Sequence, residues 1–292
     1  MSHLPESQIP GIYHRRIGDM LVTALSDGYL DSTLDVIQVL ERDEAAAMLM
    51  QAFRPSPPRI SVNAFLVRSG RRTALIETGS GDTMGPTLGW LFRNLSAAGV
   101  SPDEIDTVLL THMHPDHSNG LRRPDGSAYF PNAEIAVHEN ELSHWWDDGR
   151  MAQATERQRV RYFEGARHQI VPYRDQLKPF RQGEVFPGIT AIPAHGHTPG
   201  HSTFLIESAG QSLLIWGDTV HVPELQVPRP EVTVDFDSDP AAAVEARRKV
   251  FDMVASERML VGGMHLHFPG FSHLVRTATG YAVAPEPWSQ VL

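Results

Sequence analysis

The chain has 292 residues, no cysteine, and 25 Lys+Arg against 35 Asp+Glu, which leaves a formal net charge of -10. Zero cysteines exclude disulfides, thiolate metal sites and cysteine nucleophiles. The acidic excess argues against a nucleic-acid partner, because two polyanions repel each other. No apolar run approaches the roughly 20 residues that a membrane span needs, and residues 1–10 show no export signal. The sequence therefore predicts a soluble, cytoplasmic protein without a membrane partner.

In the first half of the chain, apolar runs and helix-forming segments follow one another irregularly. The expected order is strand 20–25, helix 43–53, strand 60–67, strand 73–76, helix 86–98 and strand 107–111. The turn-forming pair Asp27-Gly28 should close the first strand, and Ser69-Gly70 should join the next two as a hairpin. Pro86 at the start and Gly99 just past the end favour the second helix.

In the second half, strands dominate after a helical stretch. The expected order is one or two helices over 139–164, strands 189–193, 202–206 and 212–216, helix 240–256 and strand 259–261. This is a layered mixture of sheet and helix rather than strict β-α alternation. Because the sequence contains no repeat, low-complexity tract or linker, we expect residues 1–292 to form a single domain.

The strongest chemical signal is a group of four ligand-type side chains within six positions, His112, His114, Asp116 and His117. In extended chain, residues i and i+2 point to one face, so His112 and His114 can hold one cation together. Pro115 keeps His114 extended and then redirects the chain, so Asp116 and His117 can reach a second cation. A solvated polar loop is the alternative interpretation.

Three further clusters place histidine or aspartate at expected strand ends. They are the loop with His195, His197 and His201, Asp218 after strand 212–216, and the loop with His265 and His267. Each alone is compatible with a capped turn or a surface histidine. Together, in a chain without cysteine, they indicate a metal site of nitrogen and oxygen ligands, which suits zinc, iron, cobalt or manganese.

With these motifs in this order, the chain resembles the metallo-β-lactamase-fold hydrolases over nearly its whole length. The stretches 84–87, 217–218, 235–239 and 265–270 are similar to the methyl parathion hydrolase-like branch. That branch is related to the quorum-quenching lactonases that open N-acyl-homoserine lactones. The resemblance implies an α+β fold, a four-layer αββα sandwich with a dinuclear metal site at the edge of its two sheets. It also allows a homodimer, as in the related enzymes.

The resemblance also implies a ligand set for two metals. The first metal is expected on His112, His114 and His197, the second on Asp116, His117 and His265, with Asp218 bridging both. Glu77 stands where the family usually has aspartate, and its longer side chain can still orient a ligand histidine. The absence of cysteine excludes the true lactamases with a cysteine ligand, and a bridging Asp218 argues against the other lactamase subclasses.

Residues around the metals should set the substrate. His221 lies where the related lactonases have a tyrosine that touches the substrate, and its imidazole could donate to the carbonyl or protonate the leaving alkoxide. It joins Asp116 and Asp218 as an expected catalytic residue. Met84 and Trp145 fall at positions similar to pocket-lining aromatic residues of the family. The alternative for all three is a plain wall or core residue.

The sequence therefore predicts a dinuclear metal-dependent hydrolase, with zinc as the first candidate metal. A metal-held hydroxide would attack a lactone or ester directly, without a covalent enzyme intermediate. The resemblance implies an apolar pocket for a small, neutral, hydrophobic ester or lactone, and promiscuous hydrolysis of organophosphate triesters such as methyl parathion or paraoxon. The alternatives are a glyoxalase-type thioesterase and a non-catalytic metal-binding protein.

Overall fold

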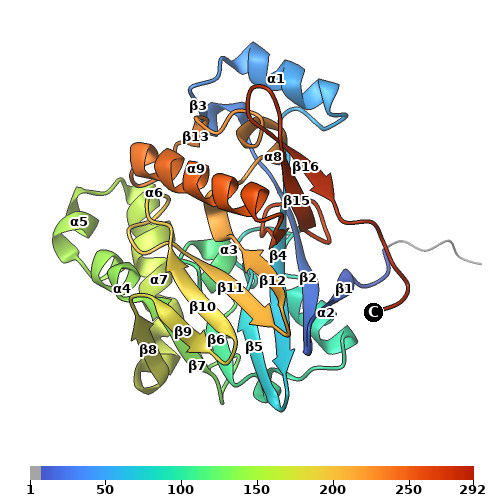
Figure 1. Ribbon diagram of the computed structural model, residues 1–292. Helices are drawn as coiled ribbons and strands as arrows, with labels where there is room; N and C mark the ends of the chain where they lie inside the picture. Colours follow the sequence, from blue (N-terminus) through green and yellow to red (C-terminus); the bar gives the residue numbers. More distant parts are fainter. Residues whose placement is uncertain (1–7) are drawn as a thin grey trace, which may run out of the picture.

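Two seven-stranded sheets form the centre of the protein in a computed structural model that describes residues 8–292 (Figure 1). The first sheet has the order β1 (Ile12–Ile17), β2 (Met20–Asp31), β4 (Arg59–Ser69), β5 (Arg72–Ile76), β6 (Thr107–Leu109), β7 (Glu134–His138) and β8 (Leu177–Phe180). The second has the order β16 (Tyr281–Pro285), β15 (Phe271–Arg276), β14 (Leu260–Gly262), β12 (Gln211–Ile215), β11 (Ser202–Ser208), β10 (Ile189–Pro193) and β9 (Gly183–Phe186). A small third sheet pairs β13 (Thr233–Val234) with β3 (Ile37–Gln38).

Short helices connect these strands, and one long helix precedes β14. The α-helices are α1 (Arg42–Gln51), α2 (Leu91–Ala97), α3 (Pro115–Ser118), α4 (Glu139–Trp145), α5 (Asp148–Gln153), α6 (Glu156–Gln158), α7 (Gly165–Ile170), α8 (Pro223–Gln226) and α9 (Pro240–Ser256). A π-helix, η3 (Arg159–Glu164), joins α6 to α7. The 3₁₀ segments are η1 (Leu34–Val36), η2 (Pro102–Glu104), η4 (Val171–Gln176) and η5 (Gly217–Thr219). Within residues 8–292, no helix has the length and apolar character to cross a membrane.

The main core lies between the two sheets. Alternate residues of a strand point to opposite faces, so Phe65 and Val67 of β4 face the second sheet and share a cluster with Phe204 and Ile215. Leu66, between them, belongs instead to the cluster on the other face of the first sheet. The continuous apolar run of β4 therefore reflects a strand that is buried on both sides.

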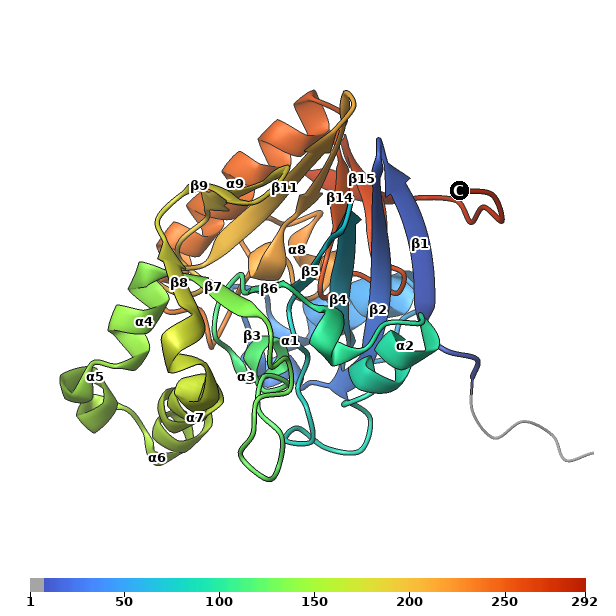
Figure 2. The same cartoon turned by 90° about the horizontal axis from the view of Figure 1, so that it is seen from below.

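Helices cover the two outer faces, which makes four layers (Figure 2). On the first sheet, Leu91 and Leu95 of α2 pack in the same cluster as Leu66. On the second sheet, Phe251 and Val254 of α9 pack in a cluster with Leu214 of β12. The four-layer αββα sandwich expected from the resemblance is confirmed.

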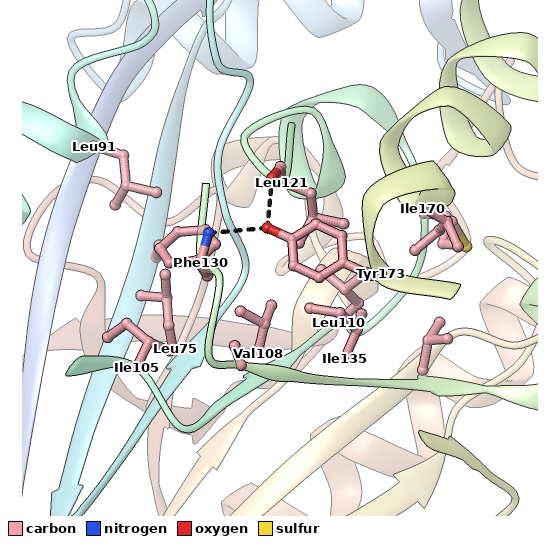
Figure 3. Packing of buried hydrophobic residues seen from close by; sticks show 14 of the residues in the cluster. Leu75, Leu91, Ile105, Val108, Leu110, Leu121, Phe130, Ile135, Ile170 and Tyr173 are labelled. Atoms are coloured by element: carbon pink, nitrogen blue, oxygen red, sulfur yellow. Dashed lines mark hydrogen bonds between the residues drawn. The ribbon is translucent and has the colours of Figure 1, made fainter. Parts of the chain in front are cut away.

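A buried tyrosine fixes the chain that leaves α3 (Figure 3). The Tyr173 hydroxyl accepts a hydrogen bond from the Phe130 N–H at 2.9 Å and donates one to the Leu121 carbonyl at 2.6 Å. Burial raises the pKa of Tyr173 to about 12, so its hydroxyl keeps the proton that it donates. This pair of bonds ties the segment after His117 to the outer helical layer.

Two local expectations were wrong. Asp27-Gly28 is not a turn, because β2 continues through it to Asp31 with a bulge between Ser26 and Gly28. Gly28 has a φ of 116°, which favours glycine. The helix expected from Pro86 begins instead at Leu91, where the Asp27 carboxylate accepts the Leu91 N–H at 3.0 Å.

The stretch 139–164 is helical as expected, but it is divided into α4, α5, α6 and η3. Capping side chains explain two of these breaks, because Asp147 caps α5 and Thr155 forms a capping box at α6. Several short or irregular strands had no clear period in the sequence and were not expected. These are β1, β3, β7, β8, β9, β13, β15 and β16.

Candidate metal centre

The candidate site lies where strands of both sheets end. His112 and His114 follow β6 of the first sheet, Asp218 follows β12, and His265 follows β14. Strands β12 and β14 run parallel, so their carboxyl ends lie at the same edge of the second sheet. All seven side chains expected to bind metal come together at this edge, in two adjoining groups.

The first group gathers around one oxygen of Asp218. Asp218 Oδ2 lies 3.5 Å from His112 Nε2 and 3.3 Å from His197 Nε2. His197 Nε2 is also 2.9 Å from His114 Nδ1. Four donor atoms from buried side chains thus face one another.

The second group faces the other oxygen of the same carboxylate. Asp218 Oδ1 lies 3.2 Å from both His117 Nε2 and His265 Nε2. Asp116 Oδ2 lies 3.5 Å from His117 Nε2 and 3.6 Å from His265 Nε2. His265 Nε2 also lies 3.3 Å from Asp218 Oδ2. The Asp218 carboxylate therefore lies between the two groups, which is the position of a bridging ligand.

The donor separations fit small divalent cations. Tetrahedral bonds of about 2.0–2.2 Å place neighbouring donor atoms about 3.3–3.6 Å apart, close to the 3.2–3.5 Å separations around Asp218. Among the described residues, His112 Nε2, His117 Nε2 and Asp218 Oδ1 are buried without a hydrogen-bond partner. Buried polar atoms normally have partners, so this cluster needs cations or protons to satisfy it.

Comparison with protein families agrees with this geometry. The sequence model of the Metallo-beta-lactamase superfamily matches residues 57–262. The chain belongs to this superfamily. A solved structure of the hydrolase AbOPH, described as a member of the beta lactamase superfamily, is 33% identical, with a TM-score of 0.92 over 97% of this chain and 100% of that one. The family match and this structure agree on the superfamily and its fold.

Other similar proteins include one more solved structure and two curated relatives. The structure of AidC, a dizinc quorum-quenching lactonase in complex with the product N-hexanoyl-L-homoserine, has a TM-score of 0.89 at 24% identity, over 96% of this chain and 99% of that one. An atrochrysone carboxyl ACP thioesterase from Aspergillus chevalieri is 28% identical over 44% of this chain and 40% of its own length. The lactamase-like protein adaB from Aspergillus niger is 33% identical over 34% of this chain and 30% of its own length. The chain thus spans less than half the length of these curated relatives.

In this member of the superfamily, the far ring nitrogens of several site histidines also lie near polar groups. His265 Nδ1 donates to the Ser61 carbonyl at 2.8 Å, which leaves Nε2 as the ring nitrogen that a cation would bind. His112 Nδ1 lies 3.0 Å from the Thr111 hydroxyl. The buried Glu77 accepts the Thr111 N–H at 2.9 Å and lies 3.5 Å from His117 Nδ1. The longer carboxylate at this position therefore faces a ligand histidine.

Asp237 is a site residue that the sequence indicated only as part of the stretch 235–239. Its carboxylate lies 2.8 Å from His197 Nδ1. Burial opposes a charged His197, but the hydrogen bonds to Asp218 and Asp237 outweigh it and raise the pKa of His197 to about 9. A cation at His197 Nε2 would have to displace this proton, while Asp237 would keep the ring oriented.

We expect Asp237→Asn to weaken metal binding about 10–100-fold, because the His197 ring loses its charged partner. Competition with a chromophoric chelator would measure the affinity. Asp235→Asn is the matched control, since Asp235 lies two residues away and is exposed. Equal affinities in the Asp237 variant and the wild type would show that Asp237 has no part in holding the ligand.

Glu141 was not singled out in the sequence, yet it joins two of the ligand-bearing loops. Its fully buried carboxylate accepts hydrogen bonds from the Met113 N–H at 2.9 Å, the Gly200 N–H at 2.8 Å and the Trp145 indole at 2.8 Å. Met113 lies between two metal-site histidines, and Gly200 lies in the loop of His197. A glutamate inside a short helical segment carries no sequence signal that would separate it from a surface residue.

The other histidines of the two loops have different roles. His201 Nδ1 donates to the Ala194 carbonyl, and its Nε2 accepts the Asp218 N–H at 2.9 Å. Burial lowers the pKa of His201 to about 3, so it stays neutral and can accept this bond. His195 lies beside His138, with ring centroids 4.8 Å apart, and His267 pairs with Glu224 at 2.6 Å. Neither His195 nor His267 belongs to the groups of possible metal ligands.

A buried arginine holds the segment that carries Asp218. Arg247 of α9 donates to the carbonyl of Thr219 at 2.7 Å, next to Asp218, and to those of Pro230 and Val232 at 2.8 and 2.7 Å. Burial lowers the pKa of Arg247 to about 10, so the side chain remains charged near neutral pH. Three carbonyl acceptors satisfy this charge in place of a carboxylate.

A pocket of about 550 Å³ opens onto the two groups of donors. His114, Asp116, Asp218, His221 and His265 lie at its base. Met84 is among the residues that line the pocket, with apolar residues such as Leu30, Ile60 and Phe236. Trp145 does not line it, because this side chain is buried behind His114 and bonded to Glu141. The lining also includes Arg157, Arg161 and Tyr162, so it is less apolar than expected from the sequence.

Proposed function

We propose that this hydrolase holds two divalent cations, with zinc as the first candidate and iron, cobalt or manganese as alternatives. His112, His114 and His197 would hold the first cation, and Asp116, His117 and His265 the second, with Asp218 shared. The observation that carries this proposal is the position of Asp218, whose carboxylate lies 3.2–3.5 Å from histidines of both sets of donors.

The proposed reaction is the addition of water to a lactone or a hydrophobic ester, which yields a hydroxy acid or an acid and an alcohol. When bound, the two cations lower the pKa of a coordinated water and polarise the scissile carbonyl. The pocket residues Leu30, Ile60, Met84 and Phe236 would receive the apolar part of the substrate. AidC, whose structure has a similar fold, is described as a quorum-quenching lactonase, and this supports the proposed substrate class.

His221 would complete the catalytic group with Asp116 and Asp218. Its Nε2 lies 3.0 Å from Asp218 Oδ2, and the side chain lines the pocket. Burial lowers the pKa of His221 to about 4, although Asp218 acts in the opposite direction. A neutral imidazole carries one N–H, which lies against Asp218. We propose that this N–H protonates the leaving oxygen as the scissile bond breaks, and that the ring regains a proton from the carboxylic acid formed.

We expect His221→Gln to lower kcat for alkyl esters and lactones about 10²-fold, because a poor leaving group needs a proton. For p-nitrophenyl esters, whose leaving group needs no proton, the loss should be much smaller. Steady-state kinetics over a leaving-group series would measure the difference. An equal loss across the whole series would contradict proton donation and leave His221 as a residue that only orients Asp218.

Two alternatives have specific support. The curated relatives include proteins named ACP thioesterases, which favours a thioester substrate as the second candidate, although the match covers less than half of each chain. Phosphotriester hydrolysis is a possible side activity, because its transition state also places negative charge on an oxygen near the cations.

The deciding experiment is metal analysis of the purified protein followed by reconstitution and a substrate screen. The panel should contain N-acyl-homoserine lactones, δ-lactones, aryl esters, a paraoxon-type triester, S-lactoylglutathione and an acyl thioester. We expect about two equivalents of metal per chain and the highest kcat/KM with a lactone or an ester. Fewer than two equivalents after reconstitution, or an inert holoprotein, would contradict the proposed function.

A further inference from the structure

One wall of the pocket carries two arginines that the proposed reaction does not use. Arg157 of α6 and Arg161 of η3 both line it, together with Thr155 and Gln158 of the same segment. The metal-site residues lie at the base of the same pocket. This segment therefore places two guanidinium groups within reach of a molecule bound at the candidate metal centre.

The helical geometry explains why these two side chains share a face. Residues four apart on a helix are neighbours on its surface, whereas residues two apart point in different directions. Arg157 and Arg161 are four residues apart and are therefore neighbours on this surface. Arg159 lies between them in sequence, does not line the pocket, and pairs with Glu164. The segment is thus rich in arginine, but only two of its arginines face the pocket.

The two pocket arginines have no acidic partner in contact. Within residues 8–292, no carboxylate oxygen lies within 4.0 Å of the guanidinium of Arg157 or Arg161, whereas ten other arginines form such pairs. Two other acids line the pocket away from the metal site. Asp31 is paired with Arg59 at 2.8 Å. Asp235 is close enough to Arg157 for the arginine charge to act on its pKa, but it forms no ion pair within 4.0 Å with either pocket arginine. The two positive charges are therefore available to a ligand.

Tyr162 connects this wall to the candidate metal centre. Its ring lies 5.0 Å from the ring of His114, centroid to centroid. Burial raises the pKa of Tyr162, and the charges of Arg161 and Arg157 act against that rise, as expected for guanidinium groups close to the phenol. A single aromatic side chain thus separates the arginine wall from a metal-site histidine.

We propose that Arg157 and Arg161 bind an anionic oxygen group, a carboxylate or a phosphate, on the part of the substrate remote from the scissile carbonyl. Guanidinium groups match the geometry of such anions and bind them with charge-assisted hydrogen bonds. This inference rests on the proposed hydrolysis and refines its substrate. The preferred ester, lactone or thioester is amphipathic and charged rather than neutral.

Matched substrate pairs test the charge and its position. The first pair is p-nitrophenyl hexanoate and the mono-p-nitrophenyl ester of adipic acid, which differ by a terminal carboxylate on the acyl side. The second pair is hexanoyl-pantetheine and hexanoyl-4′-phosphopantetheine, which differ by a phosphate on the leaving-group side. We expect the charged member of at least one pair to have a kcat/KM about tenfold higher, mainly through KM. The pair that responds identifies the source of the anion.

Variants assign the effect to these residues. The Arg157→Gln/Arg161→Gln double variant should lose the preference, and its activity on the uncharged substrates should stay near that of the wild type. Arg159→Gln is the matched control, because it removes a charge from the same segment outside the pocket and should keep the preference. Metal content and circular dichroism confirm that each variant is folded. No preference in either pair, or a preference that survives the double variant, would overturn the inference.

A binding measurement separates this inference from the proposed hydrolysis. Zinc-reconstituted protein is titrated calorimetrically with adipate against hexanoate, and with 4′-phosphopantetheine against pantetheine. Tighter binding of the more charged ligand that depends on Arg157 and Arg161 would support the anion site even if every ester were inert, in which case only the proposed hydrolysis fails. Hydrolysis of uncharged esters without arginine-dependent binding or preference would leave the proposed function standing and reject the anion site.

Discussion

Replacing Asp218 with asparagine is expected to lower kcat by about 10³-fold or more, because the cations supply several kcal/mol of transition-state stabilisation and this carboxylate faces both sets of donors. Its two oxygens lie 3.2–3.5 Å from histidines of the two groups. An amide of the same shape has one neutral oxygen and one NH₂ group, and the NH₂ cannot bind a metal. At least one cation should therefore be lost or weakly held.

The measurement combines steady-state kinetics with elemental analysis of the same preparation. Asp31→Asn is a suitable control, because Asp31 also lines the pocket but is paired with Arg59 away from the donor groups. The control should keep both its metal content and its kcat. If Asp218→Asn retained two tightly held metals and near-normal turnover, the shared-ligand arrangement would be wrong.

Much of the site could be predicted because its residues are concentrated in short motifs at strand ends. His112, His114 and His117 lie within six positions, and Asp218 follows a clear apolar strand. The apolar run 60–67 also predicted a strand, and β4 occupies it, with Phe65 and Leu66 on opposite faces. These features depend on local order along the chain, which a sequence displays directly.

Other parts of the site depend on distant contacts, and no local pattern reveals them. Glu141 is 59 residues from Gly200 in sequence, although its carboxylate accepts the Gly200 N–H. Arg157 and Arg161 lie in a polar segment whose charges are indistinguishable from those of a solvated surface until the fold places them against the pocket. Spacing alone also could not choose among the histidines of the 195–201 loop. His197 faces the Asp218 carboxylate, whereas His201 accepts the Asp218 N–H, and only the fold sets these two contacts.

Replacing Glu141 with glutamine is expected to lower the free energy of unfolding by about 2–4 kcal/mol, because it breaks a buried, charged hydrogen-bond network. The carboxylate accepts three N–H groups, from Met113, Trp145 and Gly200. In glutamine one of the two terminal atoms becomes a donor, so it opposes at least one of these N–H groups. The substitution also frees the chain around Met113 from the loop of His197, which should weaken metal binding about 10–100-fold.

Chemical denaturation of the metal-free protein isolates the first effect, since bound metal would itself stabilise the folded state. Competition with a chelator then measures the loss of metal affinity. Glu139→Gln is the matched control on the same helix, because Glu139 is partly exposed and pairs with Arg181 at the surface, where such pairs contribute about 0–1 kcal/mol. A Glu141 variant as stable as this control would mean that the two loops are held by their packing alone. A variant with lower stability but unchanged metal affinity would confine the role of Glu141 to the fold.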